Sequence, residues 1–248
     1  MTFATIIVNH GTSRTSNQKE AINFLKERIK EKYPSSFVRS FMASDKIRRN
    51  TIDESLNQDL SEILEECRMK NIKNVRFLMI YVVRGLEYEK VIKKAEKENK
   101  DRFFDFTFTK ALLEEEYYDD KIFSLLEKIS KAETSLVVCH GSPKKYLDQF
   151  DKFYEKIKKY DDNLYFSTFE NRNYDNLIEE FQRKNIKKIK IIPFLIIAGN
   201  HVYKDIEGEK ENSYKKVFEK NKIEIQVVKK SLILYEEIVQ IFIGKLEK

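Results

Sequence analysis

The chain is poor in the residue types that most often carry chemistry or interrupt secondary structure. Its 248 residues include three histidines, two cysteines, three prolines, six glycines and no tryptophan. Cys67 and Cys139 lack the paired spacing of a zinc ribbon or redox motif. Because adjacent strand residues point to opposite faces, Cys139 and His140 are not expected to form a nucleophilic pair. We therefore expect reduced thiols in a cytoplasmic protein.

Several longer patterns are also missing. No apolar run approaches the ~20 residues of a membrane-spanning helix, and the opening FATIIV does not resemble a signal peptide. The absence of Gly-x-Gly-x-x-Gly and P-loop patterns counts against a flavodoxin-like nucleotide or flavin protein. Charged residues are spread along the chain, as on solvated helix faces. We expect no membrane or nucleic-acid partner, whereas the net charge of +6 favours an anionic small molecule.

Short β-branched or aromatic runs alternate with longer amphipathic stretches to the end of the chain. This alternation predicts an α/β fold with parallel strands joined by helices. Eight strands are predicted, over 4–9, 36–43, 74–83, 103–109, 135–139, 164–169, 187–194 and 223–228. The amphipathic pattern predicts helices over 16–32, with Ser16 as the cap, over 53–69 and over 234–247.

Two motifs occur twice. The first sets a histidine and a glycine after an apolar run, in IIVNHGTS at 6–13 and LVVCHGSP at 136–143. The second follows the third strand of each half and reads Gly, any residue, then a residue that can bind a metal or a proton, at 85–87 and 199–201. This recurrence indicates an internal duplication of a βαβαβ-like half.

The duplication predicts two similar halves, 1–115 and 134–248, with a boundary near 115–134 and a C-terminal helix that can cross to the first half. The acids Asp45 and Glu170, near the ends of the second strands, form a looser third match. No Pro/Gly/Ser-rich linker separates the halves, so we expect them to pack closely around an active-site cleft.

Ligands of parallel α/β sheets bind at the carboxyl ends of the strands. His140, Glu170 and His201 are predicted there and make a nitrogen and oxygen donor set suited to a divalent first-row metal. A histidine also titrates near pH ~6.5, so one of these residues can act as ligand or proton acceptor. Glu87 and His10 follow other strands and are expected to converge on the same cleft.

The two HG turns are predicted to bind substrate. Backbone N–H groups and hydroxyls near helix N-termini suit carboxylate or phosphate groups. The turns contribute His10, Gly11, Thr12 and Ser13 from the first copy and Gly141 and Ser142 from the second.

Each candidate also has a purely structural interpretation. A histidine at a strand end is often a hydrogen-bonded structural residue. Glu87 and Glu170 are two among 41 acidic residues and can simply be solvated. Gly85 and Gly199 can serve only to supply a positive φ in a tight turn.

Taken together, the motifs resemble those of the anaerobic sirohydrochlorin cobaltochelatases, the class II tetrapyrrole chelatases of CbiK type, over nearly the whole chain. The resemblance rests on NHGTS at 9–13, GLEYEKV at 85–91, VCHGSPKKY at 138–146, the acid of STFEN at 167–171 and IPFLIIAGNHVYKDI at 192–206. It implies two flavodoxin-like, chelatase-like halves, each a parallel sheet flanked by helices, with the tetrapyrrole in the cleft between them.

The resemblance also implies roles for individual residues. His140 resembles the family's catalytic histidine and metal ligand, Glu170 and His201 resemble its other cobalt ligands, and Glu87 resembles its active-site acid. Family members carry an aromatic residue at the position of His10. That leaves His10 either as an additional ligand or as part of the HG form of related chelatases.

The implied activity is insertion of Co²⁺, as a substrate metal, into sirohydrochlorin or precorrin-2 in anaerobic cobalamin biosynthesis, without an organic cofactor. Two alternatives share the fold: a ferro- or nickel-chelatase acting on a related tetrapyrrole, and a carrier that binds the ring or metal without insertion. The helix faces also leave room for a homo-oligomer.

Overall fold

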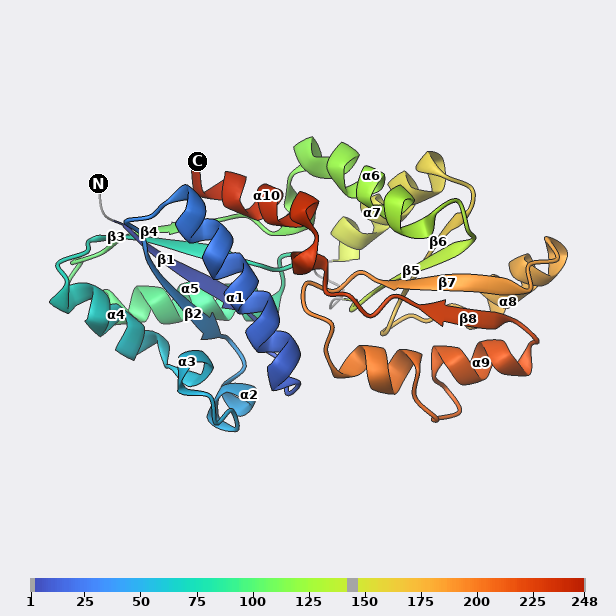
Figure 1. Cartoon of the computed structure of the whole chain (residues 1–248), viewed down its shortest axis with the longest axis horizontal. Helices are drawn as coiled ribbons and strands as arrows, with labels where there is room; N and C mark the ends of the chain where they lie inside the picture. The colour runs from blue at the N-terminus through green and yellow to red at the C-terminus, as the bar shows by residue number, and fades with distance from the viewer. Residues whose placement is uncertain (1–2, 142–146, 248) are drawn as a thin grey trace. The chain divides into compact units, whose positions relative to one another are not determined.

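The structure is a computed structural model that describes residues 3–141 and 147–247; the predicted substrate-binding residue Ser142 lies outside this range. The chain divides into two compact units, one formed by Met1–Glu116 with Ile233–Lys248 and the other by Tyr117–Leu232. Each unit contains a four-stranded parallel sheet flanked by helices (Figure 1). This architecture confirms the predicted α/β class with two similar halves.

The sheet of the first unit has the strand order β2-β1-β3-β4. All six residues of β1 are buried, as expected for a strand covered on both faces. The strands are β1 (Ala4–Asn9), β2 (Phe37–Met42), β3 (Asn74–Met79) and β4 (Asp105–Phe108).

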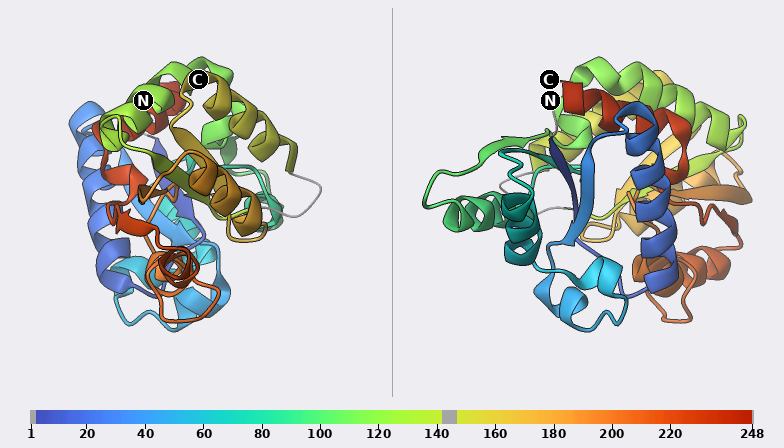
Figure 2. Two further views of the ribbon diagram at one scale, coloured as in Figure 1. Left: turned by 90° about the vertical axis from the view of Figure 1, so that its right-hand side faces the viewer. Right: turned by 60° about the vertical axis from the view of Figure 1, so that its left-hand side comes forward.

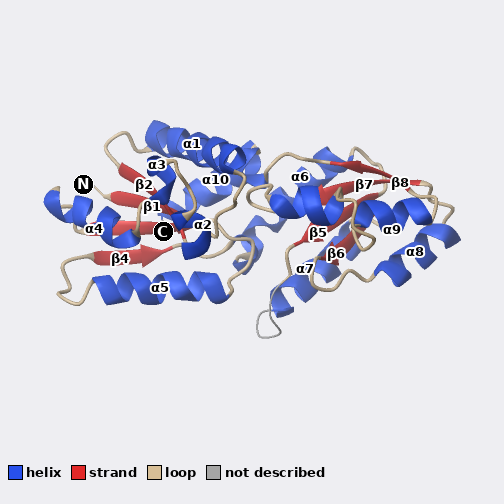
Figure 3. Ribbon diagram, turned by 90° about the horizontal axis from the view of Figure 1, so that it is seen from below, coloured by secondary structure: helices blue, strands red, loops and turns tan. Residues whose placement is uncertain are grey.

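Helices cover both faces of this sheet (Figure 3). One face, with Ala4, Ile6 and Val8, packs with α4 and α5 in a continuous apolar core. On the other side α1 and α10 lie together although more than 200 residues separate them in the sequence (Figure 2). The helices are α1 (Thr15–Lys32), α2 (Asp45–Arg49), α3 (Glu54–Asn57), α4 (Leu60–Met69), α5 (Leu86–Glu98) and α10 (Glu236–Gly244).

The second unit repeats the arrangement with the strand order β6-β5-β7-β8. Leu136 and Val138 of β5 pack with α8 and α9 on one face of the sheet, and α6 and α7 lie on the other (Figure 1). The elements are β5 (Ser135–Cys139), β6 (Leu164–Thr168), β7 (Lys188–Pro193), β8 (Glu224–Val227), α6 (Asp119–Ser130), α7 (Leu147–Tyr160), α8 (Tyr174–Arg183) and α9 (Tyr214–Lys220).

The strand registers show which residues of the two units correspond. The first strand of each unit pairs in parallel with the third, as in Val8 with Met79 and Val138 with Pro193. Counting from these pairs makes His10 equivalent to His140 and Glu87 equivalent to His201. The HG motif and the Gly-x-ligand motif therefore each occupy the same topological position in both units.

Two local predictions differ from the structure. The segment 53–69 forms two helices because the backbone at Gln58 is not helical, and Asp53 and Asp59 cap the separate helices. The predicted cap at Ser16 is wrong, since α1 begins one residue earlier. The Oγ1 atom of Thr12 instead accepts a hydrogen bond from the backbone N–H of Arg14 at 3.3 Å, which tightens the turn before the helix.

The C-terminal segment is anchored to the first unit by a buried lysine. Lys245 is 4% exposed, and its Nζ lies 3.0 Å from a carboxylate oxygen of Glu115. The same Nζ donates to the carbonyl of Ala111 at 2.7 Å. Among the described residues, every helix is too short or too polar to cross a membrane.

Candidate functional site

His140 stands at the carboxyl end of β5. All five residues of that strand are buried, whereas His140 is exposed. The next residue, Gly141, has a φ of +93°, a conformation that residues with a side chain rarely adopt. The chain therefore leaves the sheet abruptly after β5, and the imidazole lies at the edge where the parallel strands end.

Glu170 is held beside this turn by the end of β6. The backbone N–H of Phe169 donates to the carbonyl of Cys139 at 3.1 Å, which continues the strand pairing beyond the sheet. Thr168 Oγ1 accepts from the N–H of Asn171 at 2.9 Å and closes a tight turn with Glu170 inside it. A Cβ atom added to Gly141 would lie 2.9 Å from Glu170 Cγ and 3.0 Å from its Oε2. Glu170 can therefore occupy this position only because residue 141 has no side chain.

His201 follows β7 and completes the group. The ring centroids of His140 and His201 are 4.7 Å apart and the rings are nearly perpendicular, at 89°. Phe169 stacks on His201, with centroids 4.8 Å apart and an angle of 21° between the rings. Of the three residues proposed from the sequence as metal ligands, His140 and His201 are therefore in ring contact, and Glu170 lies beside Gly141, the residue that follows His140.

Two further residues support His201 and were not singled out from the sequence. Asp205 Oδ2 lies 2.8 Å from His201 Nδ1. The other oxygen of Asp205 accepts a hydrogen bond from Arg172 Nη2 at 3.0 Å. The only sequence signal was the spacing of four between His201 and Asp205, which places two side chains on one side of a helical turn. Arg172 had no local signal, because it reaches the site from a different strand end.

A buried tyrosine forms hydrogen bonds with the end of β6. Tyr214 is fully buried, and its hydroxyl donates to the carbonyl of Thr168 at 3.1 Å and lies 2.8 Å from Ser167 Oγ. Burial raises the pKa of Tyr214, so the phenol remains neutral. Burial also raises the pKa of the Cys139 thiol well above its ordinary value, which agrees with the expectation that this cysteine is not a nucleophile.

The side chains at this edge are near one another without being arranged around a common centre. Among residues 3–141 and 147–247, no three His, Cys, Asp or Glu side chains form a group that could hold a metal ion as they stand. His140 and Glu170 are exposed, and the side chain of His201 is 44% exposed. Exposed side chains change rotamer within nanoseconds, so the rotamers seen here are not the only ones open to these residues.

The equivalent turn of the first unit has a different neighbour. His10 is exposed after β1, and Gly11 has a φ of +97°. A Cβ atom on Gly11 would lie 3.1 Å from the sulfur of Met42. In the second unit, the side chain beside the equivalent glycine is that of Glu170. Thr12 is buried and Ser13 is exposed.

The looser match between the acids Asp45 and Glu170 does not hold in the structure. Glu170 follows the end of β6 by two residues, whereas Asp45 follows the end of β2 by three. The counterpart of Glu170 is therefore Ser44, whose backbone N–H donates to the carbonyl of His10 at 3.0 Å. Asp45 begins α2 and pairs with Arg48 at 2.7 Å.

Glu87 lies in the first turn of α5, which follows β3. Its Oε1 accepts a hydrogen bond from Lys90 Nζ at 2.6 Å, and its side chain is 32% exposed. Gly85 caps α5 with φ −154° and ψ −172°. All six glycines are described, and only Gly11 and Gly141 have a positive φ. The interpretation that Gly85 and Gly199 supply a positive φ is therefore wrong.

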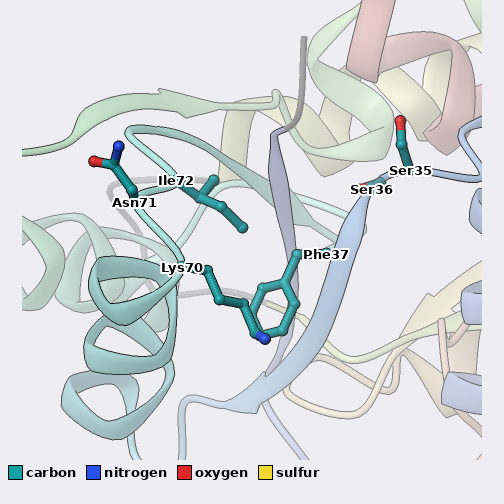
Figure 4. Close-up of a pocket in the computed structure, with 6 residues that line it drawn as sticks. All are labelled: Ser35, Ser36, Phe37, Lys70, Asn71 and Ile72. Carbon is teal, nitrogen blue, oxygen red and sulfur yellow. The ribbon is translucent and has the colours of Figure 1, made fainter.

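A depression elsewhere in the first unit is separate from these strand ends. It has a volume of about 430 Å³ and lies at the amino end of β2, beside the turn that joins α4 to β3 (Figure 4). It is lined by Ser35, Ser36, Phe37, Lys70, Asn71 and Ile72. None of the residues predicted for the site lines it.

The fold itself is that of chelatases. The structure of SirB from Bacillus subtilis with Fe³⁺ is similar to this chain with a TM-score of 0.69 and 12% sequence identity, over 100% of this chain and 95% of SirB. The structure of the sirohydrochlorin chelatase SirB from Bacillus subtilis subspecies spizizenii in complex with cobalt has a TM-score of 0.67 at 12% identity, over 100% of this chain and 94% of that one. Two parallel sheets with this topology therefore define a chelatase-like α/β protein.

The sequence assigns the chain to one family within that class. The model of the family described as cobalt chelatase (CbiK) matches residues 3–248, and the chain belongs to this family. The sirohydrochlorin cobaltochelatase CbiKC of Nitratidesulfovibrio vulgaris is 20% identical over 236 residues, which cover 92% of this chain and 84% of that protein.

Proposed function

We propose that the protein is a sirohydrochlorin cobaltochelatase, which inserts Co²⁺ into sirohydrochlorin or precorrin-2 in anaerobic cobalamin biosynthesis. The observation that carries the proposal is the pairing of His140 and His201 beside Glu170, at the carboxyl end of a parallel sheet in a member of the cobalt chelatase family. The tetrapyrrole and the divalent metal are both substrates in this proposal, and no organic cofactor takes part.

His140, His201 and Glu170 are the proposed ligands of the incoming ion. Two imidazoles and one carboxylate suit Co²⁺ and leave coordination positions open to the ring nitrogens. A site with few protein ligands also serves transfer, since a fully enclosed ion would be released slowly. The exposure of these side chains supports this assignment, because a macrocycle must reach the metal directly.

The reaction also has to remove two protons. Two pyrrole N–H groups lose their protons as the metal binds all four ring nitrogens. In the proposal His140 accepts a proton at the ring as it releases the metal, and Glu87 acts as a further acceptor. The net charge of a dianionic ring and a divalent cation is then balanced without any other reactant.

The acetate and propionate groups of the ring are anionic. We assign their binding to the two HG turns, with backbone N–H groups and hydroxyls of His10, Gly11, Thr12 and Ser13, and of Gly141 and Ser142. The net charge of +6 favours the approach of such a substrate.

Fe²⁺ and Ni²⁺ are the alternative metals. The donor set contains no thiolate, and imidazole with carboxylate accepts all three ions, so the ligands alone discriminate weakly. An anaerobic spectrophotometric assay with sirohydrochlorin and Co²⁺, Fe²⁺ or Ni²⁺ supplied separately decides between them. We expect Co²⁺ to give the fastest turnover. Turnover no faster than the spontaneous reaction with every metal would contradict the proposal and favour a carrier that binds the ring without insertion.

The site assignment has its own test. His140→Ala and His201→Ala should each lower the rate of insertion by about 10²-fold or more, because each substitution removes a proposed metal ligand. His140→Ala also removes the proposed proton acceptor. Circular dichroism should show that both variants remain folded. His10→Ala, at the equivalent turn of the first unit, is the matched control and should lose less. Equal rates for all three variants and the unaltered protein would refute the assignment.

A further inference from the structure

We propose that Asp205 is a positioning residue that holds His201 in the tautomer able to bind the metal, and that Arg172 holds Asp205 in place. The metal-binding part of this inference rests on the proposed function, whereas the hydrogen-bond part does not. Asp205 would act through His201 and would not touch the substrate.

The first step of the argument is the contact between the two side chains. Asp205 Oδ2 lies 2.8 Å from His201 Nδ1. A carboxylate oxygen only accepts hydrogen bonds, so the neutral imidazole must carry its proton on Nδ1 to make this bond. The lone pair is then on Nε2, the other ring nitrogen. Histidine ligands of metals typically donate their second N–H to a carboxylate or carbonyl in this way.

The second step is the rigidity of Asp205. Its other oxygen accepts a hydrogen bond from Arg172 Nη2 at 3.0 Å. Arg172 is itself held, because its Nε donates to the Phe169 carbonyl at 3.3 Å and its Nη1 contacts the Asn212 carbonyl. The Arg172 side chain is 19% exposed and that of Asp205 is 26% exposed. Both oxygens of Asp205 therefore have partners that fix the carboxylate in one orientation.

The third step is the turn that carries both residues. Val202–Ile206 is a π-helical turn, closed by a hydrogen bond from the N–H of Glu207 to the carbonyl five residues earlier, at 3.0 Å. Such turns are rare and occur frequently at functional sites. A Cβ atom on Gly208 would lie 2.0 Å from the carbonyl oxygen of Lys204, so only glycine fits there. The backbone thus sets the spacing between His201 and Asp205.

The tautomer can be measured directly. In ¹H–¹⁵N spectra of the imidazoles at a pH where they are neutral, we expect the His201 signals of the Nδ1–H form. Asp205→Ala should shift His201 toward the Nε2–H form, which predominates in unconstrained histidine, whereas Asp205→Glu keeps both carboxylate oxygens as acceptors and should retain the Nδ1–H form. With only three histidines in the chain, single His→Gln variants assign the signals.

The consequence for the metal is measured without tetrapyrrole. Titration with Co²⁺ alone should show a Kd raised about 10- to 100-fold in Asp205→Ala, the usual effect of losing such a support. Asp205→Glu, which keeps the carboxylate, should recover most of the affinity. Glu179→Ala removes an exposed acid from α8 and is the control for a change in net charge; it should leave the Kd unchanged.

The outcomes separate the two proposals. If Asp205→Ala leaves the His201 signals in the Nδ1–H form, the positioning role is wrong even when the protein is an active chelatase. If the unaltered protein binds no Co²⁺ but the tautomer depends on Asp205 as expected, the proposed function is wrong and the hydrogen-bond part stands. Should Asp205→Ala fail to fold, Asp205→Asn takes its place, because Arg172 binds the one amide oxygen and leaves the NH2 group facing His201 Nδ1. An unchanged Nδ1–H signal in that variant would overturn the inference.

Discussion

At the scale of single residues, the two glycines of the HG turns do different things in the same backbone conformation. Gly11 and Gly141 have φ values of +97° and +93°, so both turns require glycine for the backbone alone. Their surroundings differ, because the space above Gly141 holds the side chain of Glu170 and the space above Gly11 holds that of Met42. The same glycine turn therefore packs against a carboxylate in the second unit and a thioether in the first.

This difference leads to a prediction for Gly141→Ala. The added methyl group would strain the backbone by about 1–3 kcal/mol and would push Glu170 from its place. We expect a lower denaturation midpoint together with a raised Kd for Co²⁺. Gly11→Ala is the matched control: it should lower the midpoint by a similar amount without changing the Kd. Equal Co²⁺ affinity in both variants would show that the position of Glu170 does not matter for metal binding.

At the scale of secondary-structure elements, the docking of the C-terminal segment depends on a buried charge. The side chains of Lys245 and Glu115 are 2% and 13% exposed, and the lysine also donates to backbone carbonyls. A buried charge whose partner is removed destabilises a protein far more than an exposed one. Lys32 and Glu247 form an ion pair in the same unit, with side chains 39% and 56% exposed.

We therefore predict that Lys245→Ala lowers the free energy of unfolding by about 3 kcal/mol, because it leaves Glu115 buried without its cation. Denaturant titration followed by circular dichroism measures the change. Lys32→Ala, which breaks the exposed pair, should leave the midpoint almost unchanged, since such pairs contribute little. A similar loss in both variants would mean that burial does not distinguish the two pairs.

At the scale of the whole molecule, the first unit is built from two distant segments of the chain. Residues 233–248 belong to it together with 1–116. Five apolar side chains of α10 are buried: Ile238, Val239, Ile241, Phe242 and Ile243. The chain must therefore be complete almost to residue 248 before the first unit has its full core.

Removal of residues 233–248 should for this reason unfold the first unit. Burial of five such side chains contributes on the order of 10 kcal/mol, which is comparable to the total stability of a domain. In hydrogen exchange followed by mass spectrometry, we expect the amides of β1–β4 to lose protection and those of β5–β8 to keep most of theirs. Unchanged protection of β1–β4 would contradict the assigned role of α10.

Much of the fold was predictable because its signals are local. Strands such as 4–9 and 135–139 are short apolar runs between amphipathic stretches, and the structure confirms both within those bounds. The equivalence of His10 with His140 followed from a repeated pattern of neighbouring residues. Gln58 interrupts the predicted helix 53–69 because capping by Asp53 and Asp59 outweighs the apolar periodicity. The predicted cap of α1 at Ser16 was wrong because α1 begins at Thr15 and its N-cap, Arg14, has no side-chain cap hydrogen bond.

By itself, the sequence determined the α/β class, the duplicated halves and the family, because these depend on periodicity and on motifs of neighbouring residues. Only the tertiary structure decided which groups meet at the site. Glu170 lies against Gly141, and Arg172 reaches Asp205, across intervals of about 30 residues. Such contacts depend on which strands lie side by side and where each one ends. No local preference of the chain encodes them, and so the support of Asp205 by Arg172 became visible only in the folded protein.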